Sequence, residues 1–121
     1  MFIAESYAKP EVDAKIDVSN ITAKNVALVI NEADTNSVKV GEYYRLARNI
    51  PRENIVRVNI PKATNKISVN AFIRLKWEID SQLHNQEQVI LLAWTKPYAV
   101  ECNSITSAMT FGYDPTQCKN T

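Results

Sequence analysis

Apolar residues are concentrated in three short runs along the chain, and the stretches between two consecutive runs are amphipathic. Val26–Ile30 is apolar throughout, which is typical of a strand buried on both faces of a sheet. Ile55–Ile60 alternates instead and places Arg57 and Asn59 on one face, which predicts a more exposed strand at a sheet edge. Val89–Trp94 is again apolar throughout. The pattern predicts two interior strands and one edge strand.

A first helix is predicted between the first two strands. Asn36 or Ser37 is expected to cap its first turn, Asn49 to adopt the left-handed conformation at its end, and Pro51 to prevent its continuation. The apolar face expected to pack on the sheet consists of Val40, Tyr43, Tyr44, Ala47 and Ile50. The opposite face carries Gly41, Glu42, Arg45 and Arg48.

A second helix is predicted over Val69–His84, with Ser68 as its cap. Its apolar face is formed by Val69, Phe72, Ile79 and Leu83, flanked by Ile73 and Leu75. Trp77 projects to the polar side of this helix and is interpreted as an exposed anchor for a partner or a missing segment. Trp94 ends an apolar strand and is expected in the core. Ser104–Met109 predicts a short third helix.

These elements predict an α/β fold with three layers and an open parallel sheet of the Rossmann-like or flavodoxin-like kind. With right-handed crossovers, the strand order is 2-1-3. The third strand then needs a neighbour on its far side, and no convincing strand follows Trp94. We therefore expect residues 25–121 to be the N-terminal part of a larger α/β domain, truncated at its C-terminus. Residues 1–24 are expected to be a tether, and two interpretations of residues 1–8 stay open: the end of a signal peptide or a frayed terminus.

The composition narrows the classes of function. The 14 Lys and Arg residues nearly balance the 13 Asp and Glu residues, so no electrostatic footprint for nucleic acid or an anionic membrane is present. With 2 glycines in 121 residues and neither G-x-G-x-x-G nor G-x-x-x-x-G-K-[ST], a nucleotide cofactor is not expected. No apolar run approaches the length of a membrane span. A single histidine and two widely spaced cysteines do not support a metal site.

Three loops are expected at the carboxyl ends of the strands, where open parallel sheets bind their ligands: 31–37, 61–67 and 95–104. The candidate ligand-binding residues are Asn31, Glu32, Asp34, Ser37, Thr95, Lys96 and Tyr98. Glu32 and Asp34 would suit acid–base catalysis or metal binding. Alternatively, they are solvated carboxylates that stabilise the N-terminus of the following helix through its dipole. Lys96 would pair with one of them, hold an anion or remain a surface lysine.

Cys102 and Cys118 are predicted to form a disulfide, which in the chain-entropy model contributes about 3 kcal/mol for a loop of roughly 15 residues. The alternative makes Cys102 a nucleophile. His84, the only histidine, is expected at the opposite edge of the sheet, so a Cys–His pair is disfavoured. No G-x-S-x-G sequence is present. No catalytic set is evident, and whether the protein is an enzyme stays open.

A more specific pattern lies in the spacing of seven residues: Tyr43, Tyr44, Arg48, Ile50, Pro51, Asn54 and Ile55. With this pattern, the stretch from Val26 to Cys118 resembles a family of exported bacterial proteins found in species that carry the exosortase sorting system. The resemblance implies a periplasmic or extracellular location and supplies no catalytic residue.

A looser resemblance is to the opening βαβ units of gingipain-like and caspase-like cysteine peptidases. In those proteins a His-Gly pair follows the third strand, whereas Thr95-Lys96-Pro97 follows it here. Two functions stay open. The chain is an exported domain that binds a small molecule or an envelope protein at the carboxyl ends of the strands, or it is the first part of a hydrolase whose catalytic residues lie beyond Thr121.

Overall fold

The computed structural model describes residues 2–5, 21–61, 65–84 and 87–118. Its helices are α1 (Thr35–Arg48), α2 (Val69–Gln82) and α3 (Ile105–Phe111). Its strands are β1 (Phe2–Glu5), β2 (Val26–Asn31), β3 (Ile55–Val58), β4 (Lys66–Ile67), β5 (Val89–Leu92), β6 (Ala99–Val100) and β7 (Asn103–Ser104). Short 3₁₀ turns precede β2 (η2, Ala23–Asn25) and β3 (η3, Arg52–Asn54), and another ends the described chain (η4, Pro115–Cys118).

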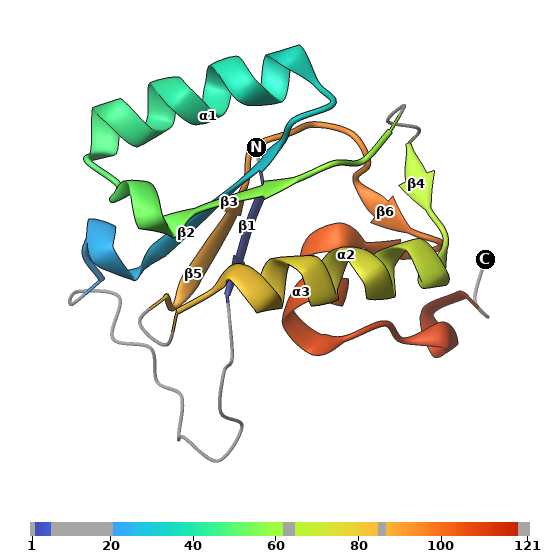
Figure 1. The fold of residues 1–121 in the computed structure, drawn as a ribbon. Coiled ribbons are helices and arrows are strands. Elements are labelled where there is room, and N and C mark those ends of the chain that lie inside the picture. Colours follow the sequence, from blue (N-terminus) through green and yellow to red (C-terminus); the bar gives the residue numbers. More distant parts are fainter. Residues whose placement is uncertain (1, 6–20, 62–64, 85–86, 119–121) are drawn as a thin grey trace.

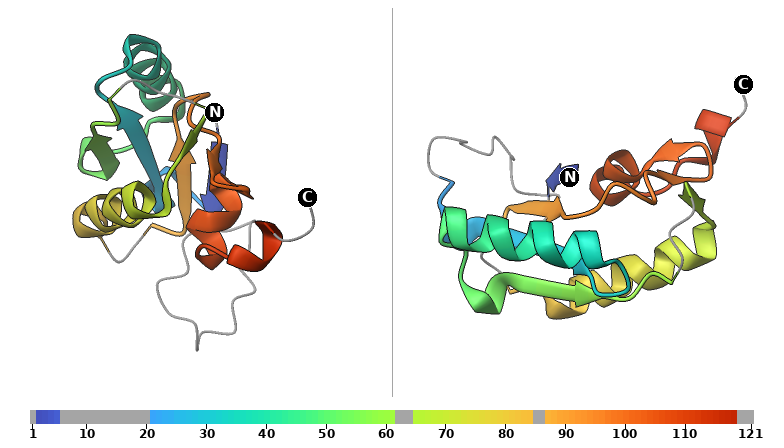
Figure 2. Two further views of the ribbon diagram at one scale, coloured as in Figure 1. Left: turned by 90° about the vertical axis from the view of Figure 1, so that its right-hand side faces the viewer. Right: turned by 90° about the horizontal axis from the view of Figure 1, so that it is seen from above.

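The main sheet has the strand order β1-β5-β2-β3. β2 is parallel to both β3 and β5, so the predicted 2-1-3 order of the parallel strands is confirmed. Figures 1 and 2 show α1 on one face of this sheet and α2 and α3 on the other. The three-layer α/β architecture predicted from the sequence is therefore correct, and it matches the open sheet of flavodoxin-like domains.

The far neighbour of β5 comes from the beginning of the chain. Phe2–Glu5, expected to belong to a tether, forms β1 and pairs antiparallel with β5, with Phe2 opposite Leu92 and Glu5 opposite Val89. A strand of 4 residues is too short to show a clear period, and a partner so distant in sequence leaves no local signal. The tether prediction is wrong for these residues. Residues 1 and 6–20, which include residues 1 and 6–8 of the proposed signal-peptide remnant, lie outside the described residues.

The N-cap of helix α1 lies two to three residues before the predicted caps. Asp34 is the N-cap, and its Oδ1 accepts a hydrogen bond of 2.9 Å from the backbone N–H of Asn36. Neither Asn36 nor Ser37 caps the helix, because both lie inside its first turn. The end of the helix follows the prediction: Asn49 is left-handed, with φ 55° and ψ 41°.

The face of α1 that packs on the sheet is the predicted one only in part, since Ile50 is buried there and Tyr44 packs against the same core. Gly41 and Ser37 are buried, whereas the side chains of Val40 and Tyr43 are exposed, at 43% and 75%. The cause is the close approach of the helix to β2. A Cβ atom on Gly41 would lie 2.5 Å from both Cγ1 and Cδ1 of Ile30. Hydrophobic periodicity ranks glycine with the polar residues, and here glycine is required at the contact.

Helix α2 covers the other face with Phe72, Leu75 and Ile79, which are buried. Ser68 caps it as predicted, since its Oγ accepts a hydrogen bond from the backbone N–H of Ala71. These three apolar residues belong to the larger core, which includes alternate residues of β2, β3 and β5. Trp94 belongs to the same core at 3% exposure, as predicted.

Strand β3 is the edge strand that its alternating pattern predicted. Val56 and Val58 are buried and Arg57 is exposed. The side chain of Gln82, at the end of α2, covers part of this edge. Its Oε1 accepts from the backbone N–H of Arg57 at 3.2 Å, and its Nε2 donates to the carbonyl of Arg57 at 3.0 Å. Gln82 thus satisfies the outward-facing backbone groups that an added strand would use.

A second, smaller sheet, ordered β4-β6-β7, follows the carboxyl ends of the main strands. β4 and β6 are parallel, and β6 and β7 form a short antiparallel pair. Ser104 caps α3, as the prediction of a short helix there implied. α3 lies against β1. This second sheet was not predicted, because its strands have 2 residues each.

Candidate functional site

The first predicted loop is held together by two of its own candidate residues. Asn31 is buried, and its Oδ1 accepts hydrogen bonds from the backbone N–H groups of Ala33 (3.1 Å) and Ile60 (2.9 Å). Its Nδ2 donates to the carbonyl of Ile60 at 3.2 Å. The Oγ of Ser37, also buried, accepts from the backbone N–H of Asn31 at 2.9 Å. Both residues lie at the predicted edge, where they tie the end of β2 to the segment after β3 and to α1.

The two carboxylates of this loop differ in role. Asp34 caps α1, as described above, and Glu32 is exposed to solvent. Among the described residues, neither forms an ion pair with Lys96, and no three His, Cys, Asp or Glu side chains are grouped to hold a metal ion. Of the two interpretations of these acidic groups, helix capping is the one that the geometry of Asp34 shows.

The third predicted loop leads into the small sheet. Thr95 and Lys96 are exposed, and the peptide bond between Lys96 and Pro97 is cis. Tyr98 is 49% exposed. Two hydrogen bonds hold its backbone: its N–H donates to the backbone carbonyl of Asn65, and its carbonyl accepts from the backbone N–H of Ile105. The structure therefore brings the second and third loops together through β4 and β6.

A pocket of about 230 Å³ lies beside the end of β3, against α2. Ile60, Pro61, Ile67, Ala71 and Leu75 give it apolar walls, and Asn59, Arg74 and Glu78 supply its polar groups. None of the predicted ligand residues lines this pocket. The sequence did indicate its position, since 61–67 was one of the three loops expected at this edge. The contribution of α2 was missed because Arg74 and Glu78 look like ordinary residues of a solvated helix face.

α2 also exposes two large apolar side chains, neither of which lines this pocket. Ile73 is 58% exposed and Trp77 is 72% exposed, so the predicted exposure of Trp77 is confirmed. Trp77 follows Arg74 by three residues and Ile73 by four, and residues at these spacings are neighbours on a helix surface. We call Ile73, Arg74, Trp77 and the adjoining pocket the α2 surface. Among the described residues, the guanidinium of Arg74 has no ion-pair partner.

The cysteines lie at disulfide distance, with a separation of 5.3 Å between the Cα atoms of Cys102 and Cys118. The predicted pairing is thus supported, and a bridged Cys102 has no thiol with which to attack a substrate. His84 follows α2 and precedes β5, at the opposite edge of the sheet from Cys102. The structure does not bring a cysteine and the histidine together.

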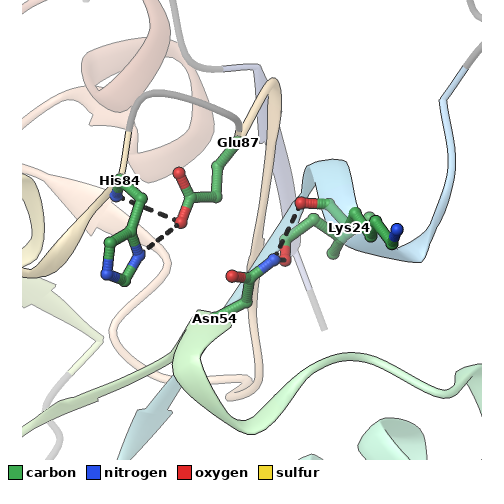
Figure 3. Close-up of polar contacts among 5 residues, drawn as sticks. Lys24, Asn54, His84 and Glu87 are labelled. Atoms are coloured by element: carbon green, nitrogen blue, oxygen red, sulfur yellow. Dashed lines mark hydrogen bonds and ion pairs between the residues drawn. The ribbon is translucent and has the colours of Figure 1, made fainter.

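A second pocket, of about 350 Å³, lies at the amino ends of the parallel strands. Its lining residues are Lys24, Pro51, Glu53, Asn54 and His84. They come from the segments that precede β2, β3 and β5. Figure 3 shows the polar contacts of Lys24, Asn54 and His84. The sequence predicts His84 at this edge, and Asn54 is one of the seven residues whose spacing carries the family resemblance. A shared site for the two residues was not predicted, because the site was expected at the other edge of the sheet.

Within the described ranges, no helix has the length and apolar character needed to cross a membrane. The chain was compared with protein-family models, with curated proteins and with solved structures, and no match was found in any of the three.

Proposed function

We propose that this chain is an exported α/β domain that binds an envelope protein through the α2 surface, beside the carboxyl end of β3. The observation that carries the proposal is Trp77, an indole that is 72% exposed on a folded helix beside an apolar pocket. Trp and Arg are the residue types most enriched among energetically dominant contacts of protein interfaces. Trp77 and Arg74 lie together here.

The size of the pocket favours a polypeptide over a free small molecule. Binding sites for small molecules usually enclose about 300–1,000 Å³, and this pocket encloses about 230 Å³. It suits one apolar side chain of a partner. In that arrangement, Trp77 and Ile73 pack against the neighbouring part of the partner, and Arg74 at the rim donates hydrogen bonds to its carbonyl or carboxylate groups.

Two features support export. The paired cysteines suit an oxidising compartment, because disulfides persist there and are rare in the cytosol. The resemblance of Val26–Cys118 to exported bacterial proteins implies the same location. No specific observation favours the peptidase-like alternative, since Cys102 lies at disulfide distance from Cys118 and His84 lies at the other edge of the sheet.

The test is selection of binding peptides from a displayed random library on the folded chain with its cysteines oxidised. Peptides are then ranked by their affinity for the parent chain, for Trp77→Ala and for Tyr43→Ala. Tyr43 is a matched control, because it is 75% exposed and lies on α1, across the sheet from α2. We expect enriched peptides to lose at least tenfold in affinity for Trp77→Ala, about 1.4 kcal/mol or more, and to bind Tyr43→Ala normally. Equal binding to all three proteins would contradict the proposal.

A further inference from the structure

The pocket at the amino edge of the sheet is distinct from the α2 surface and offers a fixed hydrogen-bond acceptor. Asn54 is only 6% exposed. Its Nδ2 donates to the carbonyls of Lys24 (2.9 Å) and Val26 (3.0 Å), so both amide hydrogens are used and the orientation of the side chain is set. The Oδ1 has no hydrogen-bond partner among the described residues. Asn54 lines the pocket, and Figure 3 shows its Oδ1 on the side that faces His84.

The imidazole of His84 is also held in place. Glu87 contributes only 1% of its side-chain surface to solvent, and its Oε1 lies 3.1 Å from Nδ1 of His84. The same oxygen accepts the backbone N–H of His84 at 3.1 Å. The Oε2 of Glu87 is buried without a partner in the described part of the chain. Glu87 therefore fixes the orientation of the imidazole at this wall of the pocket.

The backbone adds negative potential at the same edge. Because the strands are parallel, α1 and α2 both end here, and each helix C-terminus carries a partial charge equivalent to about half a negative unit. Arg45 and Arg48 in the last turn of α1 offset the charge at its end, whereas α2 has no basic residue in its last turn. The carboxylate of Glu53 also lines the pocket. Lys24 lines it too, but Figure 3 shows its ammonium directed away from Asn54 and His84.

From these features we infer that the amino-edge pocket binds a primary ammonium group. The ammonium donates one hydrogen bond to Oδ1 of Asn54 and is attracted by the Glu53 carboxylate and by the C-terminus of α2. Three N–H donors on a compact cation match an acceptor-rich pocket. The volume of about 350 Å³ lies within the range of small-molecule sites, so the whole of a short alkylamine or a lysine side chain fits.

The test is titration of the ¹⁵N-labelled, folded chain with n-butylammonium chloride, followed by the backbone amide shifts of Lys24, Glu53, Asn54 and His84. Tetramethylammonium chloride is the matched probe, because it has the same charge and no N–H donor. We expect saturable shifts with n-butylammonium and none with tetramethylammonium. N-acetyl-lysine methylamide, titrated in parallel, distinguishes a side chain within a peptide from a free amine. Absence of saturable shifts with both n-butylammonium and the lysine amide would overturn the inference, as would equal shifts with tetramethylammonium.

Two variants locate the site without disturbing the buried Asn54. Glu53→Gln removes the carboxylate at the pocket, and Glu32→Gln removes an exposed carboxylate at the opposite edge. We expect the Kd for n-butylammonium to increase at least about fivefold in Glu53→Gln, as for loss of a nearby opposite charge, and to stay unchanged in Glu32→Gln. Equal affinities in the two variants would contradict the assignment. Neither result bears on the proposed binding of a partner by the α2 surface, which is tested separately.

Discussion

Replacing Gly41 by alanine tests the close contact between α1 and the sheet. The added Cβ would lie 2.5 Å from both Cγ1 and Cδ1 of Ile30, a side chain with no exposed surface. Overpacking of this kind costs about 1–3 kcal/mol. The higher helix propensity of alanine returns about 1 kcal/mol. We therefore expect the free energy of unfolding to fall by about 1 kcal/mol in Gly41→Ala.

The sign of the effect should reverse when Ile30 is shortened. In Ile30→Ala, the nearest remaining atom of that side chain is Cβ, at 3.7 Å from the new methyl group, which is an ordinary contact. Only the gain in helix propensity remains, so Gly41→Ala should stabilise the Ile30→Ala background by about 1 kcal/mol. The four proteins of this double-mutant cycle are compared by urea unfolding, followed by far-UV circular dichroism. Destabilisation of the same size in both backgrounds would refute the contact as the reason for the glycine.

Three further predictions concern other parts of the fold. Asn31→Ala should lower the free energy of unfolding by about 1–3 kcal/mol because the backbone N–H groups of Ala33 and Ile60, in part-buried hydrogen bonds, lose their acceptor, whereas Glu32→Ala should change it by less than about 0.5 kcal/mol; urea unfolding measures both. The pKa of Asp114 is lowered from 3.8 mainly by its hydrogen bond from the Thr116 side chain and then by the Thr116 backbone N–H. The stabilisation is therefore present above pH 3.8 and lost as the pH falls through the lower folded-state pKa. NMR titration should find this pKa higher in Thr116→Val. Gln82→Ala should uncover the β3 edge and promote association at high concentration, which sedimentation velocity detects; a monomer at all concentrations would contradict this role.

The parallel core of the fold was predictable because its strands carry strong local patterns. β2 and β5 are continuously apolar and β3 alternates, and these differences alone give the order β3-β2-β5. β1 was not predictable in the same way, since a short edge strand that pairs across most of the chain has no period of its own. The packing face of α1 was predicted only in part, because close backbone approach favours Gly41 and Ser37, which hydrophobicity ranks as polar.

The candidate sites, too, were predictable from the sequence only in part. The carboxyl edge was predicted from topology, and Asn31 and Ser37 do lie there. The hydrogen bonds that join Asn31 to the segment after β3, however, depend on Ile60, whose position relative to Asn31 only the folded sheet fixes. The amino-edge pocket depends on three turns that precede three different strands. No spacing in the sequence connects Asn54 with His84, and only the parallel arrangement of the sheet brings them to one pocket.

The claim that the α2 surface is the binding surface is tested most directly by mapping a library-selected peptide onto the ¹⁵N-labelled chain. We predict that the amide shifts induced by the peptide cluster at Asn59, Ile67, Ala71 and Arg74 and at the indole N–H of Trp77, while the indole N–H of the buried Trp94 shifts little. Shifts that cluster instead on the outer face of α1, around Tyr43, or on the loop that carries Glu32 and Asp34 would contradict the account.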